Sequence, residues 1–222
     1  MIPPKQSSAF VAQMEEVLDI YSWPRDKACP VVCMDEQPKQ LIKETRVPLP
    51  MEPGKPLRYD HEYERAGTAN HFLFTAPLEK WRKVSVRERK TKIDWACEVK
   101  SLLDDDFPEV DLVILICDQL NTHCISSLYE AFDPAEAKRL ADRLDLRHTP
   151  KHGSWLNIAE IELSVLTRQC LNRRIPDIQT LRNEAKAWAQ SRNKKQKSVN
   201  WQFKTEDARI KLKRLYPQIN ES

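Results

Sequence analysis

Three acidic residues are placed where a fold could bring their carboxylates together. Asp118 follows residues 112–117, a run that is apolar without alternation, rich in β-branched residues and too short for a helix. Such a run predicts a strand buried on both faces of a mostly parallel sheet. Asp35 ends a second short apolar run over residues 30–35, and Glu160 lies in residues 154–163, which have helical periodicity. Ligand and metal sites gather at the carboxyl ends of strands in open α/β sheets.

Two strand-end aspartates and one helical glutamate would form a cluster with definite chemistry. The carboxylates repel one another unless cations lie between them, and hard oxygen ligands with few other donors suit Mg²⁺ or Mn²⁺. Each acid also has an ordinary structural alternative. Asp118 could be paired with a basic side chain or cap a helix, and Glu160 could lie at the margin of a core face. The repetition of the strand-end pattern favours the metal site.

Length and composition place the chain among soluble globular proteins. It has 222 residues, of which 41% are hydrophobic, enough for one substantial domain with a helical appendage. No apolar run approaches the roughly 20 residues needed to cross a bilayer, and no charged start followed by an apolar core and a cleavage site indicates secretion. The six cysteines include no CxxC pair, which indicates reduced, buried thiols in a cytosolic protein.

Charge is distributed unevenly along the chain. From Leu166 onward there are 14 Lys and Arg against 5 Asp and Glu, a net charge of +9, whereas the preceding part has 22 against 28, a net charge of −6. An acidic front and a basic tail would suit an enzyme that handles a polyanion such as nucleic acid. A solvated helical face is the alternative explanation of the basic tail.

Hydrophobic periodicity predicts a mixed α/β layout with one sheet. Strands are expected over residues 30–35, 112–117 and 144–148, with a hairpin over 69–75 and 81–86 and a proline-rich surface loop around 48–56. Helices are expected over residues 10–21, 91–103, 125–131, 134–144, 178–190 and 206–215, and from 154 onward, with a polar basic linker over 192–197. Thr91 and Ser154 are the predicted N-caps of their helices. The predicted inward face of the 91–103 helix consists of Ile93, Ala96, Val99 and Leu103.

Four motifs in order resemble one known family. They are residues 32–40 (VCMDEQPKQ), 67–70 (GTAN), 118–123 (DQLNTH) and 148–160 (HTPKHGSWLNIAE). Together they resemble the catalytic domain of bacterial insertion-sequence transposases of the mariner-like group, over about residues 2–217. The resemblance implies an α/β, ribonuclease-H-like fold, in which helices flank a mixed central sheet and a helical extension follows at the C-terminus. It also implies an Asp-Asp-Glu triad of Asp35, Asp118 and Glu160. Glu162 would point about 200° around the helix, so it is expected on the solvent side or supporting the site from behind.

The resemblance implies divalent-metal-dependent DNA cleavage followed by strand transfer. Asp35, Asp118 and Glu160 would hold two Mg²⁺ or Mn²⁺ ions, with Asp35 bridging them. Water would attack the phosphodiester at the end of the element, and the freed 3′-hydroxyl would attack target DNA. The implied partners are the element ends and target DNA, together with a second copy of the chain or a full-length transposase. The protein would act in the bacterial cytoplasm at the nucleoid, with no membrane partner.

Seven further residues are candidates for DNA contact, each with a plainer role as a turn, cap or solvated residue. They are His123, Lys151, His152, Asn157, Lys194, Lys195 and Lys197. The expected division of the chain is a residual helical linker over 1–29, the catalytic domain over 30–172 and a basic helical extension over 173–222.

The sequence departs from the family pattern at two places. Gln119 replaces the usual asparagine after the second aspartate, and only one helix precedes Asp35, where helix-turn-helix domains are usual. The chain is therefore expected to be a truncated transposase. The alternatives are a nuclease of the same fold without strand transfer, or an inactive relic that binds DNA through its basic tail.

Overall fold

A five-stranded mixed sheet forms the centre of the molecule. The computed structural model describes residues 7–56, 58 and 60–217. The strand order is β3-β2-β1-β4-β5, in which β1 pairs with β2 and β2 with β3 antiparallel, while β4 runs parallel to β1 and β5. The strands are β1 (Val31–Glu44), β2 (Tyr63–Ala76), β3 (Trp81–Arg87), β4 (Val113–Cys117) and β5 (Leu144–His148). The predicted mixed sheet and hairpin are confirmed.

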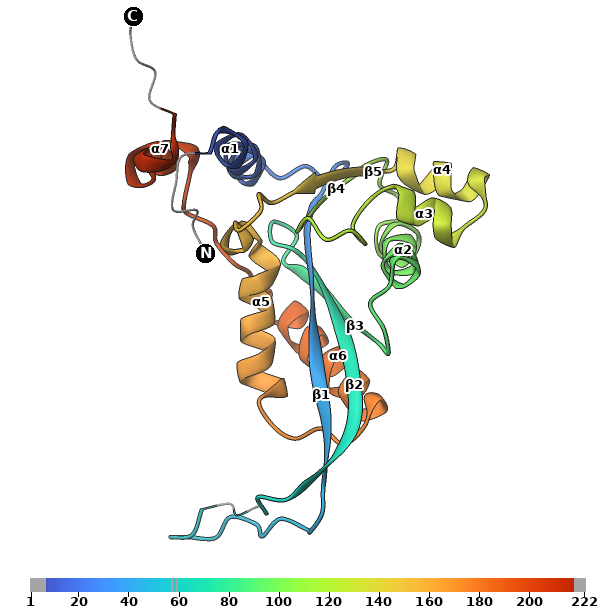
Figure 1. The fold of residues 1–222 in the computed structure, drawn as a ribbon, viewed down its shortest axis with the longest axis vertical. Coiled ribbons are helices and arrows are strands. Elements are labelled where there is room, and N and C mark those ends of the chain that lie inside the picture. Colours follow the sequence, from blue (N-terminus) through green and yellow to red (C-terminus); the bar gives the residue numbers. More distant parts are fainter. Residues whose placement is uncertain (1–6, 57, 59, 218–222) are drawn as a thin grey trace, which may run out of the picture.

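Helices cover both faces of the sheet (Figure 1). The first face packs against α1 (Ser8–Ser22), α5 (Ile158–Leu166), α6 (Ile178–Lys194) and α7 (Thr205–Lys211). The second packs against α2 (Lys92–Ser101), α3 (Ser126–Ala131) and α4 (Pro134–Asp142). α1 and α7 lie side by side at one end of the molecule although they come from opposite ends of the chain. In the part of the chain that the structure describes, no helix combines the length and apolarity needed to span a membrane.

Strand β1 continues well beyond the residues predicted for it. The prediction placed Asp35 at the end of the strand, whereas the strand runs on to Glu44. Its parallel pairing with β4 ends at Cys33, and from there to Glu44 β1 pairs only with β2. Asp35 therefore lies at the end of the parallel pairing, inside the strand. Pro38 is tolerated there because the side of β1 opposite β2 is unpaired, so a missing N–H breaks no ladder bond.

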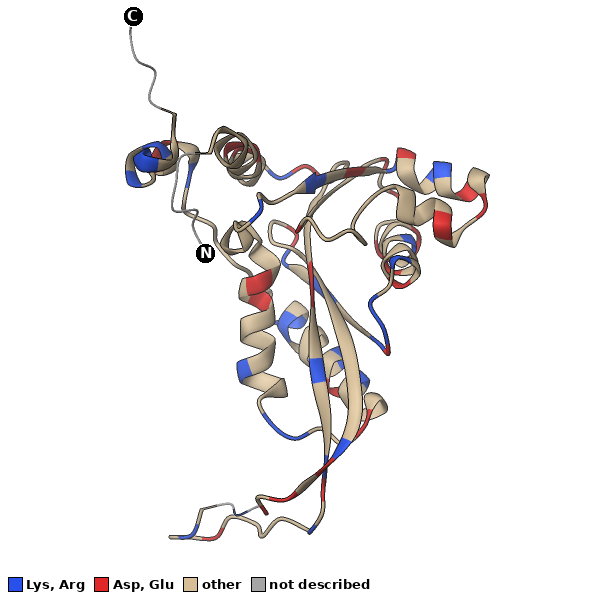
Figure 2. Ribbon diagram, in the orientation of Figure 1, with Lys and Arg blue, Asp and Glu red and all other residues tan. Residues whose placement is uncertain are grey.

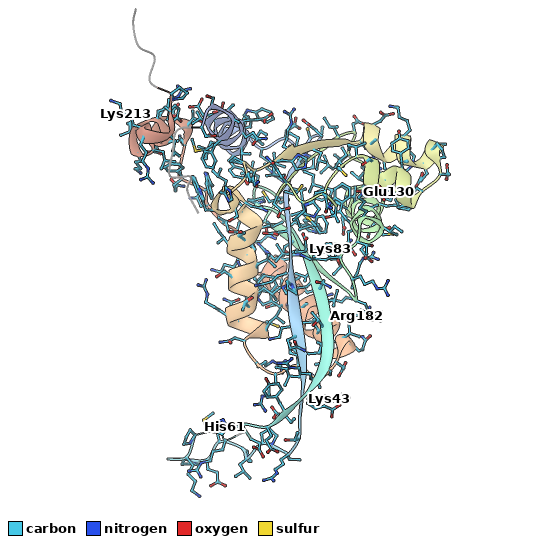
Figure 3. All side chains as sticks on the ribbon, in the orientation of Figure 1. Lys43, His61, Lys83, Glu130, Arg182 and Lys213 are labelled. Carbon is cyan, nitrogen blue, oxygen red and sulfur yellow. The ribbon has the colours of Figure 1, made fainter. Side chains whose placement is uncertain are left out.

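The hairpin of β1 and β2 extends past the rest of the sheet as an arm. Residues 45–62 connect the two strands, with isolated bridges between Leu49 and Arg58 and between Glu52 and Lys55. Figure 3 labels Lys43 where the strands leave the body and His61 in the arm. The proline-rich stretch that was predicted to form a long surface loop lies in this arm.

Two helices depart in detail from the sequence prediction. On α2, Thr91 is the N-cap and forms a capping box with Asp94, as predicted. However, Ile93 is 55% exposed, and Trp95 takes the inward place instead. α6 extends to Lys194, so half of the predicted basic linker is helical. The three-part division of the chain stays a prediction.

Candidate active site

The register of two parallel strands brings Asp35 and Asp118 together. Cys33 of β1 pairs with Ile116 of β4, and both side chains pack in the core on the α1 and α5 side of the sheet. Asp35 and Asp118 each follow this pair by two positions, so the two residues lie near each other, and the charge of Asp118 acts on the carboxyl of Asp35. The proximity of Asp35 and Asp118 depends on the register between β1 and β4, which are far apart in the sequence, and it needs no short-range motif.

Glu160 reaches the same side of the sheet from the first turn of α5. Asn157 caps this helix by accepting a hydrogen bond from the Ala159 N–H at 3.1 Å. The other end of its amide donates to the carbonyl of Met34 at 2.8 Å, which ties the start of α5 to the residue before Asp35. The prediction that Ser154 caps this helix is wrong, because Ser154 instead begins a 3-10 turn over Ser154–Leu156.

A cavity of about 440 Å³ lies between β1 and α5 and joins two of the three acids. Its lining residues are Asp35, Glu36, Gln37, Glu160, Leu163, Ser164, Thr167 and Arg168. Asp118 does not line it. Figure 2 shows acidic residues at one end of α5 beside acidic residues of β1, and a basic residue towards the other end of the helix. The cavity is therefore negatively charged at one end and has a guanidinium at the other.

Electrostatics at Asp35 are those of a carboxylate with too few counter-charges. The pKa of Asp35 is raised from 3.8 to about 7: burial contributes most, the nearby charges of Asp118, Glu36 and Glu160 add to it, and one hydrogen bond from the Glu36 N–H opposes them. Within the described residues, neither Asp35 nor Glu160 has an ion pair with Lys, Arg or His. A proton or a bound cation is therefore needed to stabilise this cluster.

Asp118 has a different environment, because a buried histidine holds it. Nδ1 of His123 lies 2.7 Å from Oδ1 of Asp118, and Nε2 lies 3.2 Å from Oε2 of Glu36. Burial raises the pKa of Asp118, but the hydrogen bond and the charge of His123 outweigh it, so the net pKa is below 3.8. Burial lowers the pKa of His123, yet its contacts with Asp118, Cys117 and Glu36 raise it well above 6.5. His123 is thus a buried cation between two acids.

The sequence analysis did not predict that Glu36 belongs to this arrangement of charged residues. Its side chain is buried, and Lys90 lies 3.5 Å from Oε1 while His123 faces Oε2. Glu36 directly follows Asp35, so strand alternation points it to the opposite face of the sheet. The only signal in the sequence was that Glu36 is an acid next to the candidate metal ligand Asp35. That signal could not indicate that Lys90 and His123 are the partners of Glu36.

The donor set suits a divalent cation in its chemistry. Three carboxylates with few competing counter-charges match hard oxygen-seeking ions such as Mg²⁺ and Mn²⁺. Across residues 7–56, 58 and 60–217, no three His, Cys, Asp or Glu side chains stand close enough together to enclose one ion. The residues therefore fit the ion by charge and type, and closure around it would require their side chains to approach one another.

The structure separates the seven candidates for DNA contact into two groups. His123 and Asn157 are buried, with their polar atoms directed at Asp118 and at Met34 respectively. Both side chains are therefore turned away from solvent, and their contacts hold Asp118 and the start of α5. The exposed candidates are Lys151, His152, Lys194, Lys195 and Lys197. None of the exposed five lines the cavity.

Two neighbouring residues, Gln119 and Glu162, have well-defined contacts. Gln119, the replacement for the usual asparagine, turns away from the acids and donates to Gln13 of α1 at 2.9 Å. Glu162 is fully buried rather than on the solvent side, and it forms ion pairs with Arg82 and Arg192. The position of Glu162 behind Glu160 agrees with the other predicted possibility, that Glu162 supports the site from inside the fold.

The fold and this arrangement of acids agree with a sequence match to a known family. Residues 30–182 match the family described as DDE superfamily endonuclease. The match covers more than half of the chain, and the protein belongs to this family. No protein with a curated functional description matches the chain.

Solved transposase structures share the fold. A mariner Mos1 paired-end complex with Mn superposes with a TM-score of 0.55 at 13% identity, covering 86% of this chain and 58% of that chain. The Mos1 transposase catalytic domain, solved with raltegravir and Mn, gives 0.54 at 10% identity and covers 85% of this chain and 86% of that one. The Mos1 strand transfer complex gives 0.54 at 11% identity. At these identities the likeness is one of fold, and the chain spans a little over half the length of the transposase in the paired-end complex.

Proposed function

We propose that the chain is the catalytic part of a DDE transposase, which cleaves DNA and transfers the freed strand with the help of divalent ions. The observation that carries the proposal is that Asp35 is buried near the carboxylates of Asp118 and Glu160, while within the described residues neither Asp35 nor Glu160 has a basic partner. The Mos1 structures with Mn, with Mg and with transposon-end DNA support the choice of ion and substrate.

The proposed roles of the residues follow from their surroundings. Asp35, Asp118 and Glu160 would hold two Mg²⁺ or Mn²⁺ ions. When bound, such ions polarise the phosphoryl oxygens and stabilise the attacking and leaving oxygens of an in-line displacement. His123 keeps Asp118 ionised and oriented, and Asn157 fixes the start of the helix that carries Glu160. Arg168 at the far end of the cavity would attract the phosphate backbone.

The test is cleavage and joining of a short labelled DNA duplex with Mg²⁺ or Mn²⁺. We expect the Glu160→Gln variant to cleave about 1,000-fold more slowly than the wild type, because the neutral amide no longer ligates the ion but keeps the size of the side chain. Joined products would distinguish a transposase from a nuclease without strand transfer. A wild type that is folded and binds DNA but neither cleaves nor joins would contradict the proposal, as would full activity of Glu160→Gln.

The exposed lysines at the end of α6 are proposed to bind the DNA backbone. Each phosphate contact releases counterions, so affinity should fall steeply as salt rises and depend little on sequence. Replacing Lys194, Lys195 and Lys197 by Gln should lower the slope of log K against log salt by about 2 to 3. Fluorescence anisotropy with a labelled duplex measures this, and Lys138→Gln on α4, whose lysine pairs with Asp142, is the control. An unchanged slope in the triple variant would assign DNA binding elsewhere.

A further inference from the structure

A buried ion cluster lies directly behind the proposed catalytic helix. Glu162 of α5 and Arg82 of β3 have side chains that are 0% exposed, with Nε of Arg82 3.3 Å from Oε2 of Glu162. Arg192 of α6 binds both oxygens of Glu162 through Nε at 3.2 Å and Nη2 at 2.8 Å. Glu162 is thereby held by two guanidinium groups from two different elements.

The guanidinium of Arg82 also holds the end of α6. Its Nη1 donates to Oδ1 of Asn193 at 3.0 Å, and Nδ2 of Asn193 donates to the carbonyl of Arg82 at 2.8 Å. Nη2 of Arg82 donates to the carbonyl of Lys197. The residues that match the endonuclease family end at 182, so Arg192, Asn193 and Lys197 lie outside the matched segment. The buried face of α5 is nevertheless anchored to them.

The cluster fixes the rotation of α5 about its own axis. Residues two apart on an α-helix point about 200° from each other, so Glu162 faces the interior while Glu160 faces the cavity. A carboxylate lies about 6 Å from the helix axis, and a rotation of about 20° would therefore displace Glu160 by about 2 Å. Mg²⁺ tolerates far smaller errors, because it demands near-ideal octahedral geometry. Asn157 is the N-cap of α5 and fixes the start of the helix. Glu162 is closer than Asn157 to Glu160 along the helix, and it lies on the opposite side of the helix from Glu160.

We propose that Glu162, Arg82 and Arg192 are positioning residues that hold Glu160 towards the cavity, and that the catalytic unit of this chain therefore extends at least to Lys197. The inference rests on the proposed function for the role of Glu160, but the rigidity of α5 can be measured without any activity. A cluster that only adds stability would leave the local order of α5 and its ion affinity unchanged in a folded variant.

Three single variants separate these possibilities. Glu162→Gln keeps the shape and one acceptor but removes the charge that both arginines need. Arg192→Met removes the outer arginine, whose side chain is 16% exposed, and leaves the buried pair of Glu162 and Arg82 intact. It therefore keeps the test available if Glu162→Gln does not fold. Glu184→Gln is the matched control, because Glu184 of α6 pairs with Arg173 at 2.7 Å on the exposed surface.

Hydrogen exchange of backbone amides is the first readout. We expect the amides of residues 161–165 in α5 to exchange at least 10-fold faster in Glu162→Gln and about 3-fold faster in Arg192→Met. The amides of β4 should keep their wild-type protection in both variants, which shows that the fold is retained. Unchanged exchange of 161–165 in both variants would overturn the proposal whether or not the wild type cleaves DNA.

Ion binding and kinetics are the second readout. Calorimetric titration with Mn²⁺ should show a Kd about 10-fold higher in Glu162→Gln, and cleavage at saturating DNA should fall by a similar factor with little change in KM for DNA. A change confined to KM would make the cluster part of DNA binding and would also overturn the positioning role. Failure of the wild type to cleave at all would contradict the proposed function alone, because the exchange measurement would still decide the role of the cluster.

Discussion

Asp35→Asn should abolish cleavage and, in the absence of metal, make the protein more stable at neutral pH. Activity should fall by about 1,000-fold or more, because Asp35 is one of the residues that would hold the divalent ions. The stability gain follows from removing a carboxylate that burial and the charges of Asp118, Glu36 and Glu160 disfavour. We expect about 2 kcal/mol at pH 8, which corresponds to a Tm increase of about 4–8 °C for a chain of this size.

The sign of the pH dependence follows from the raised pKa. Asp35 has a pKa of about 7 in the folded protein against 3.8 as its ordinary value. Below pH 3.8 it is protonated in both the folded and the unfolded state, so wild type and variant should differ little. As pH rises towards 7 the folded state must bind a proton that the unfolded state has lost, and above 7 it must carry the charge. The advantage of Asp35→Asn should therefore grow between about pH 4 and 7 and level off above that range.

Melting curves in EDTA between pH 4 and 8 measure this difference, and added Mn²⁺ provides a second comparison. Because the ion competes with the proton on Asp35, Mn²⁺ should stabilise the wild type more at pH 8 than at pH 6, and should stabilise Asp35→Asn hardly at all. Asp111→Asn is the control, since Asp111 is an exposed acid just before β4. A variant that melts below the wild type at pH 8 would show that Asp35 is compensated by a partner.

Local sequence signals predicted the elements whose cause is local. The unbroken apolar run of β4 indicated a strand buried on both faces, and every residue from Val113 to Cys117 is buried. Thr91 indicated its helix start because the capping hydrogen bonds join residues three apart. All three acids were assigned to the correct elements, although Asp35 lies inside β1 and not at its end, because β2 pairs with β1 as far as Glu44.

Long-range partners explain what the sequence could not predict. The sequence left open whether Glu162 lies near solvent or supports the site from behind, and its burial depends on Arg82, which comes 80 positions earlier on β3, and on Arg192 on α6. Without knowing which strand faces α5, no periodicity distinguishes a buried paired glutamate from an exposed one. His123 raised the same difficulty, because its burial depends on Glu36 from a distant strand. In both cases a polar residue on a predicted surface is buried because charges far along the chain meet it.

His123→Ala is expected to have the largest effect on stability. His123 is buried between Asp118 and Glu36, and without it the ion pair that the buried Glu36 carboxylate keeps among the described residues is with Lys90, at 3.5 Å. Removing one partner of a buried ion pair costs about 3 kcal/mol, so Tm should fall by about 6–12 °C. Cleavage should fall about 10- to 100-fold, because Asp118 loses the group that orients it. His61→Ala in the arm, where the imidazole is exposed, should change neither Tm nor cleavage.

A double variant identifies the buried charge as the cause of this loss. If His123→Ala destabilises the fold because it leaves Glu36 ionised and unpaired, then adding Glu36→Gln should restore part of the stability, and the two changes should be less than additive. The pKa of His123 is raised above 6.5, so its contribution is fully present below pH 6.5 and is lost progressively as pH rises into the alkaline range. The wild type should therefore approach the stability of His123→Ala at high pH. Strict additivity in the double variant, together with a pH-independent difference in stability between wild type and His123→Ala, would contradict this explanation. His123 would then contribute by packing against Trp95, whose ring centroid lies 5.8 Å away, and its positive charge would not be needed to hold Asp118 in place.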